Sequence, residues 1–109
     1  IRDYIHVDDL GSAHLKARES LPPGKGLCVT LGTGRGTSVR QIIDACREVT
    51  GHPIPEVMGE RRAGDPPELV ADARLAKELL GWETQYNDPK RIIETAWVWH
   101  KSHPNGYAS

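Results

Sequence analysis

Eleven glycines and eight prolines divide this chain of 109 residues into short elements. Proline cannot donate a backbone hydrogen bond, and both residue types favour turns, so we expect a chain rich in loops. Between these breaks, apolar residues recur at helical spacing in four places. The four predicted helices cover about residues 7–21, 38–51, 72–81 and 88–103.

Capping signals mark the ends of these helices. Asp8 is predicted to be the N-cap of the first helix, where its carboxylate can accept from a free backbone N–H. Ser38 and Gln41 have the spacing of a capping box. Asp72 is predicted to cap the third helix, and Asp88 precedes a proline suited to the first helical position. A glycine follows the last apolar residue of the second and third helices, as is usual at helix ends.

Three short apolar segments are strand candidates. Residues 27–31 form a continuous apolar run with β-branched members, residues 54–58 are weakened by neighbouring prolines, and residues 69–71 form a third piece. The predicted fold class is therefore α/β, with two or three short strands and about four helices. Because so few strands make no independent sheet, we expect one lobe of a larger protein. The start at Ile1 rather than Met fits an incomplete chain.

Charge and composition exclude several classes of protein. Fourteen basic and fifteen acidic residues give a formal net charge of −1, which argues against a surface for nucleic acid or anionic membrane. No apolar run approaches the ~20 residues of a membrane span, and no signal peptide opens the chain. Cys28 and Cys46 both lie in apolar patterns, so we expect two buried free thiols and a cytoplasmic location.

The segment at residues 32–36, Gly-Thr-Gly-Arg-Gly, lies between a predicted strand and a predicted helix. Backbone N–H groups at a helix start attract anions, so a phosphate site is one interpretation. However, the third glycine comes one residue too early for the dinucleotide fingerprint, and no Gly-Lys-Ser/Thr follows for a Walker loop. We therefore favour a tight turn in which the glycines serve the backbone.

Two arginine-containing segments are candidate anion sites. Residues 61–67, Arg-Arg-Ala-Gly-Asp-Pro-Pro, carry charges on a proline-stiffened loop. Arginine pairs well with phosphate oxygens, and a nearby aspartate can accept from sugar hydroxyls. The alternative is a solvated turn in which Asp65 pairs with an arginine, and the spacing alone favours neither. The role of Arg2 beside Asp3 is also ambiguous. Arg2 can bind an anion, but an ion pair with Asp3 at a strand edge is the commoner outcome.

The remaining polar residues form no catalytic or metal-binding pattern. His14 lies on the apolar stripe of the first helix and is expected to be at least half-buried. His100 and His103 have no third ligand nearby, which argues against zinc. No nucleophile arrangement and no Tyr-x-x-x-Lys pair occurs. We predict no catalytic, cofactor-binding or metal-binding residue in this chain.

Taken in order, several blocks resemble the C-terminal part of the UDP-glucose 4-epimerase family, within the extended short-chain dehydrogenase/reductase superfamily. The similarity covers essentially the whole chain and is carried by residues 2–10 (Arg-Asp-Tyr-Ile-His-Val-Asp-Asp-Leu), 31–39, 61–66, 71–73, 80–82 and 103–107.

This resemblance implies that residues 1–109 form the UDP-sugar-binding lobe and that the NAD-binding Rossmann lobe, with the catalytic Tyr and Lys, precedes it. In the family the sugar is oxidised at C4 by hydride transfer to NAD, turns over as a 4-keto intermediate and is reduced again. By the same resemblance, Arg2 and Arg62 contact the pyrophosphate and Asp65 holds the ribose end. The lobe alone is expected to be inactive.

The resemblance also implies partners. The longer enzyme is expected to be a homodimer, and the isolated lobe is expected to self-associate through apolar surface near Trp97 or Trp99. Two departures leave the sugar open, including N-acetylated or pentose sugars. Leu69 replaces a common aromatic residue, and Thr30 replaces a common Asn. Alternative functions are a lobe of another nucleotide-sugar enzyme, a decarboxylase or dehydratase, and a module that has lost ligand binding.

Overall fold

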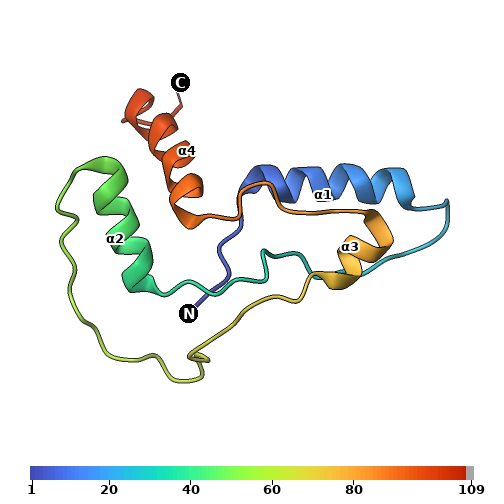
Figure 1. The fold of residues 1–109 in the computed structure, drawn as a ribbon, viewed down its shortest axis with the longest axis horizontal. Helices are drawn as coiled ribbons and strands as arrows, with labels where there is room; N and C mark the ends of the chain where they lie inside the picture. The colour runs from blue at the N-terminus through green and yellow to red at the C-terminus, as the bar shows by residue number, and fades with distance from the viewer. Residues whose placement is uncertain (108–109) are drawn as a thin grey trace.

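Four helices, connected by extended segments, form the framework of the computed structural model, which describes residues 1–107. They lie in two pairs (Figure 1), one of α1 with α3 and one of α2 with α4. A long segment between α2 and α3 sweeps around the outside of the molecule. The helix bounds are α1, Val7–Ser20; α2, Val39–Thr50; α3, Arg74–Leu80; and α4, Pro89–Ser102.

The helix ends confirm most of the capping signals. Ser38 and Gln41 form the predicted capping box, and Gly51 ends α2 with a φ of 70°. Asp88 caps α4, with proline at its first position. The predicted cap of α1 was wrong: the Nδ1 atom of His6 accepts from the backbone N–H of Asp8, and the Asp8 side chain is not the cap. The imidazole lies one residue outside the first helical turn and reaches that amide at 2.9 Å.

The start of α3 also differs from the prediction. Ala73 occupies the N-cap position and makes no side-chain cap. Asp72 lies one residue earlier, where its carboxylate accepts from the backbone N–H of Arg74 at 3.1 Å and pairs with the guanidinium of the same residue. An aspartate in this place satisfies one free amide of the helix start without being the cap itself.

The predicted strands do not form among residues 1–107. The only ladder-like pairings described are two isolated bridges, in which Arg2 lies antiparallel to Thr37 and parallel to Leu69. Residues 27–31 and 54–58 stay outside any ladder because no neighbouring extended segment offers its N–H and C=O groups to them. Within this chain, the α/β prediction is therefore correct for the helices and wrong for the strands.

The core lies between α1 and α3. It consists of Ala13, Ala76, Leu80 and Trp82, with the indole N–H of Trp82 donating to the backbone oxygen of Asp9 at 2.9 Å. The buried Asp9 carboxylate accepts from the backbone N–H groups of residues 85 and 86, which fixes the segment after Trp82. By contrast, α2 and α4 contain no fully buried residue.

Three side-chain predictions need correction or refinement. Both cysteines are free, as expected, but Cys28 is exposed and Cys46 is only half-buried. His14 is exposed, and its Nδ1 atom hydrogen-bonds the backbone oxygen of residue 10. Trp97 and Trp99 are both half-buried: Trp97 lies edge-on to a histidine after α2, and Trp99 stacks on one that follows α4. The thin packing of the α2–α4 pair explains why Cys46, which lies on α2, is less buried than predicted. Trp97 and Trp99, near which exposed apolar surface was expected, are more buried than that expectation.

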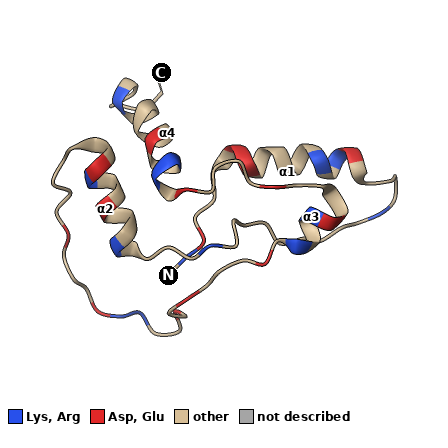
Figure 2. Ribbon diagram, viewed as in Figure 1, with Lys and Arg blue, Asp and Glu red and all other residues tan. Residues whose placement is uncertain are grey.

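The molecule is open. Its accessible surface is 8417 Å², against ~6000 Å² expected for a compact monomer of this mass. Its radius of gyration is 16.9 Å, against about 13 Å for a compact chain of this length. Figure 2 shows acidic and basic residues interspersed on the helices, with no extended run of one sign. Among the described residues, no helix is long and apolar enough to cross a membrane.

Candidate functional site

Three segments that are far apart in the sequence meet around Arg2. The backbone N–H of Arg2 donates to the oxygen of Thr37 at 3.0 Å, and the N–H of Thr37 donates back at 2.8 Å. On the other side, the N–H of Leu69 donates to the oxygen of Ile1 at 3.0 Å. We call residues 1–3, 33–37 and 69–71 together the three-segment junction. It places a candidate anion-binding arginine between residues 32–36, the glycine-rich turn, and the segment that follows residues 61–67, the arginine loop.

The Asp3 carboxylate holds this junction together. Its Oδ1 atom accepts from the backbone N–H of Thr33 at 2.9 Å and from the Thr33 hydroxyl at 2.6 Å. Its Oδ2 atom accepts from the backbone N–H groups of Gly34 at 2.9 Å and Ala71 at 3.3 Å. Partial burial acts to raise the pKa of Asp3, but these hydrogen bonds outweigh it and hold the pKa below its ordinary value.

The same hydrogen bonds decide what the glycine-rich turn does. The amides of Thr33 and Gly34, which a phosphate would need, already donate to Asp3. Gly34 has a φ of 76°, and a Cβ on Gly32 would lie 2.4 Å from the Ala71 Cβ and 2.7 Å from an Asp3 oxygen. The turn is therefore a scaffold, as favoured from the sequence. It does not fit a dinucleotide, because its amides already have an acceptor.

The Arg2 side chain points to the arginine loop. Its Nη1 atom donates to the backbone oxygens of Ile1 at 2.8 Å and Pro66 at 3.1 Å. Among residues 1–107, no ion pair joins it to Asp3 or to another carboxylate. The ion pair between Arg2 and Asp3, which is the commoner outcome for such neighbours, does not form among the described residues. The positive charge of Arg2 thus has no carboxylate partner. An arginine in this condition can pair with the oxygens of a bound anion.

Arg62 and Asp65 pair with each other. The Arg62 Nε atom lies 2.8 Å from Asp65 Oδ2, and the Arg62 side chain is 84% exposed. This is the solvated turn that the sequence left as an alternative. Arg2 and Leu69 line a cavity of about 450 Å³, whereas Arg62 and Asp65 do not line it. Because an exposed ion pair contributes little, Arg62 can exchange Asp65 for a phosphate at small cost.

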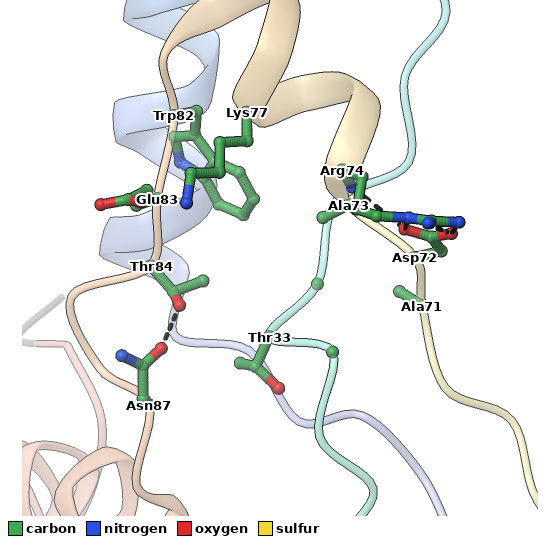
Figure 3. A pocket seen from close by; sticks show the side chains of 12 residues that line it. Thr33, Ala71, Asp72, Ala73, Arg74, Lys77, Trp82, Glu83, Thr84 and Asn87 are labelled. Atoms are coloured by element: carbon green, nitrogen blue, oxygen red, sulfur yellow. Dashed lines mark hydrogen bonds and ion pairs between the residues drawn. The ribbon is translucent and has the colours of Figure 1, made fainter.

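A larger cavity of about 560 Å³ lies next to the glycine-rich turn and was not foreseen from the sequence. Its charged side chains form two ion pairs on opposite sides of it (Figure 3): Asp72 with Arg74, and Lys77 with Glu83. Thr84 hydrogen-bonds Asn87 on the same wall. Within the described part of the chain, no three His, Cys, Asp or Glu side chains gather in a way that could hold a metal ion. The four charged side chains that line this cavity are therefore paired with one another.

Sequence comparison identifies the relatives of this chain. It is 49% identical over 110 residues to a UDP-glucose 4-epimerase of Halalkalibacterium halodurans, matching 100% of this chain and 33% of that protein. It is 51% identical over 107 residues to the UDP-glucose 4-epimerase of Streptomyces lividans, matching 98% of this chain and 32% of that protein. The chain is homologous to a segment of the UDP-glucose 4-epimerases. It spans about one third of the length of these curated relatives.

Solved structures agree with the sequence relatives. One UDP-glucose 4-epimerase crystal structure matches with a TM-score of 0.91 and 52% identity, over 100% of this chain and 33% of that one. The epimerase from Bifidobacterium longum, solved with NAD⁺ and UDP, matches with a TM-score of 0.88 and 35% identity, over 96% of this chain and 31% of that one. The open arrangement of helices is thus also found within larger epimerase chains. No family model matches the chain.

Proposed function

We propose that this chain is the UDP-sugar-binding lobe of an NAD-dependent UDP-glucose 4-epimerase. In this proposal residues 1–109 are the C-terminal lobe, and the NAD-binding Rossmann lobe lies in the part of the relatives' length that the chain does not match. Arg2 and Arg62 bind the diphosphate, and Asp65 binds the ribose. The lobe supplies no catalytic residue, so it is inactive alone. The longer enzyme, as a homodimer, interconverts UDP-glucose and UDP-galactose through a 4-keto intermediate.

The observation that carries this proposal is the state of Arg2. Its guanidinium reaches Pro66, directly after Asp65, and has no carboxylate partner among the described residues. A positive group held at the base of the Arg61–Pro67 loop favours a doubly charged anion, and two arginines match the two phosphates of a nucleoside diphosphate. The identity of about half of the residues to UDP-glucose 4-epimerases supports the uridine nucleotide as the ligand.

A UDP titration of the chain at low salt tests the proposal, because salt screens contacts between exposed arginines and phosphate. Arg62→Ala should raise the dissociation constant about tenfold or more, since one charge-assisted contact is lost. Arg61→Ala is the matched control: this neighbouring arginine is also exposed and is assigned no contact. Equal losses in both variants, or no UDP binding by the unaltered chain, would contradict the proposed site.

A pentose nucleotide sugar is the second candidate substrate. A probable UDP-arabinose 4-epimerase of Oryza sativa is 45% identical to this chain over 109 residues, matching 100% of the chain and 27% of that protein. UDP-glucose and UDP-arabinose share the nucleotide and differ only in the sugar, so the arginine contacts serve both. Because UDP itself lacks the sugar, competition of the two UDP-sugars against bound UDP distinguishes them.

A further inference from the structure

The Asp3 carboxylate connects its own segment of the junction to the other two. It accepts four hydrogen bonds from Thr33, Gly34 and Ala71, which belong to the glycine-rich turn and to the segment after the arginine loop. An ionised carboxylate has about four lone-pair sites, so Asp3 has no acceptor left for Arg2. Because neutral donors occupy the Asp3 oxygens, the Arg2 guanidinium makes no ion pair with Asp3.

The backbone is shaped to admit this carboxylate. Any side chain at Gly32 would place its Cβ 2.7 Å from Asp3 Oδ2, closer than real contacts allow. Arg2 and Asp3 line the same cavity, together with Leu69 and Ala71. The hydrogen bond from Ala71 to Asp3 therefore sets the distance between residues 69–71 and Arg2.

We propose that Asp3 is a positioning residue for anion binding: it ties the glycine-rich turn to residues 69–71 and leaves the Arg2 guanidinium free for a diphosphate. The proposal rests on the proposed function, because it takes the diphosphate as the ligand of Arg2. It adds a role for a residue that the ligand does not touch.

Asp3→Asn tests the proposal, since an amide group offers one acceptor oxygen in place of two. The dissociation constant for UDP should rise about tenfold, because the glycine-rich turn and residues 69–71 are no longer fixed around Arg2. The matched control is Asp9→Asn, which alters a buried carboxylate that also accepts two backbone amides but lines neither cavity. We expect the control to lower the melting temperature at least as much as Asp3→Asn and to leave UDP affinity within about twofold. Unchanged UDP affinity in Asp3→Asn, or equal losses in both variants, would overturn the positioning role.

Amide hydrogen exchange separates this proposal from the proposed function. The N–H groups of Thr37 and Leu69 bond to residues 1–2 and not to Asp3. Asp3→Asn should speed exchange at both amides more than Asp9→Asn does. If the unaltered chain binds no UDP, the proposed function fails. The positioning of the segments is then decided by exchange alone, and unchanged rates at both amides would overturn it.

Discussion

His6 joins the two helix pairs through both nitrogens of its ring. The Thr95 hydroxyl donates its single proton to the oxygen of Ile92 at 2.8 Å, so its contact with His6 Nε2 at 2.8 Å must be accepted from an Nε2–H. Nδ1 then carries the lone pair, which accepts from the backbone N–H of Asp8. One neutral tautomer therefore caps α1 and binds α4 at the same time, and the ring also stacks on Tyr86 at a centroid distance of 3.9 Å.

We expect His6→Ala to lower the free energy of unfolding by about 2 kcal/mol, because it removes a helix cap and a part-buried hydrogen bond. Urea denaturation followed by circular dichroism measures the effect. His14→Ala is the control, since that histidine is exposed and makes only one local hydrogen bond. Similar losses in the two variants would show that His6 does not join the helix pairs in solution.

Asp3 should also make the free energy of unfolding depend on pH below about pH 4. Its folded pKa lies below the ordinary value of 3.8, so its contribution to stability is present above that value and is lost as the pH falls through the folded pKa. Unfolding free energies measured between pH 6 and ~2.5 should therefore fall less steeply for Asp3→Asn than for the unaltered chain below about pH 4. Parallel curves would contradict the hydrogen bonds described for this carboxylate.

At the scale of the element, the features that could be predicted from the sequence are those formed by residues close to one another along the chain. The capping box of α2 and the Asp88–Pro89 start of α4 involve residues close in sequence, and both predictions are confirmed. Strands depend on distant partners, and residues 27–31 find none within residues 1–107. The site shows the same division: Arg2 could be named from its motif, but the four hydrogen bonds of Asp3 come from residues 30 or more positions away.

Two glycines should respond oppositely to alanine. Gly51 ends α2 with a φ of 70°, so Gly51→Ala should destabilise the chain by about 1 kcal/mol. Gly11 lies inside α1 with open space around its missing Cβ, so Gly11→Ala should stabilise it by about 0.5–1 kcal/mol. Thermal unfolding of the two variants measures both signs. A gain in stability from Gly51→Ala would contradict the left-handed helix end.

At the scale of the whole molecule, the excess of accessible surface indicates missing contacts. Apolar side chains remain exposed on α1, on α3 and on the segment between α2 and α3: Leu15 is 61% exposed, Leu79 51% and Met58 91%. We predict that the chain self-associates to cover such surface, and sedimentation velocity over a range of concentrations measures it. A single monomeric species at all concentrations would be the contrary result. Leu79→Glu should weaken the association. Lys101→Glu is the control, because Lys101 is a charged, exposed residue of α4, and it should not weaken the association.

The three-segment junction has a consequence for the order of folding. Asp3 and Ala71 are 68 positions apart, so bringing them together closes a long loop, whereas each helix forms from neighbours. Contacts across such separations form slowly compared with helix growth. We therefore expect the helices to appear first and the Arg2 site last. A chain that is already helical would still lack the anion site that we propose at Arg2 until this final closure is complete.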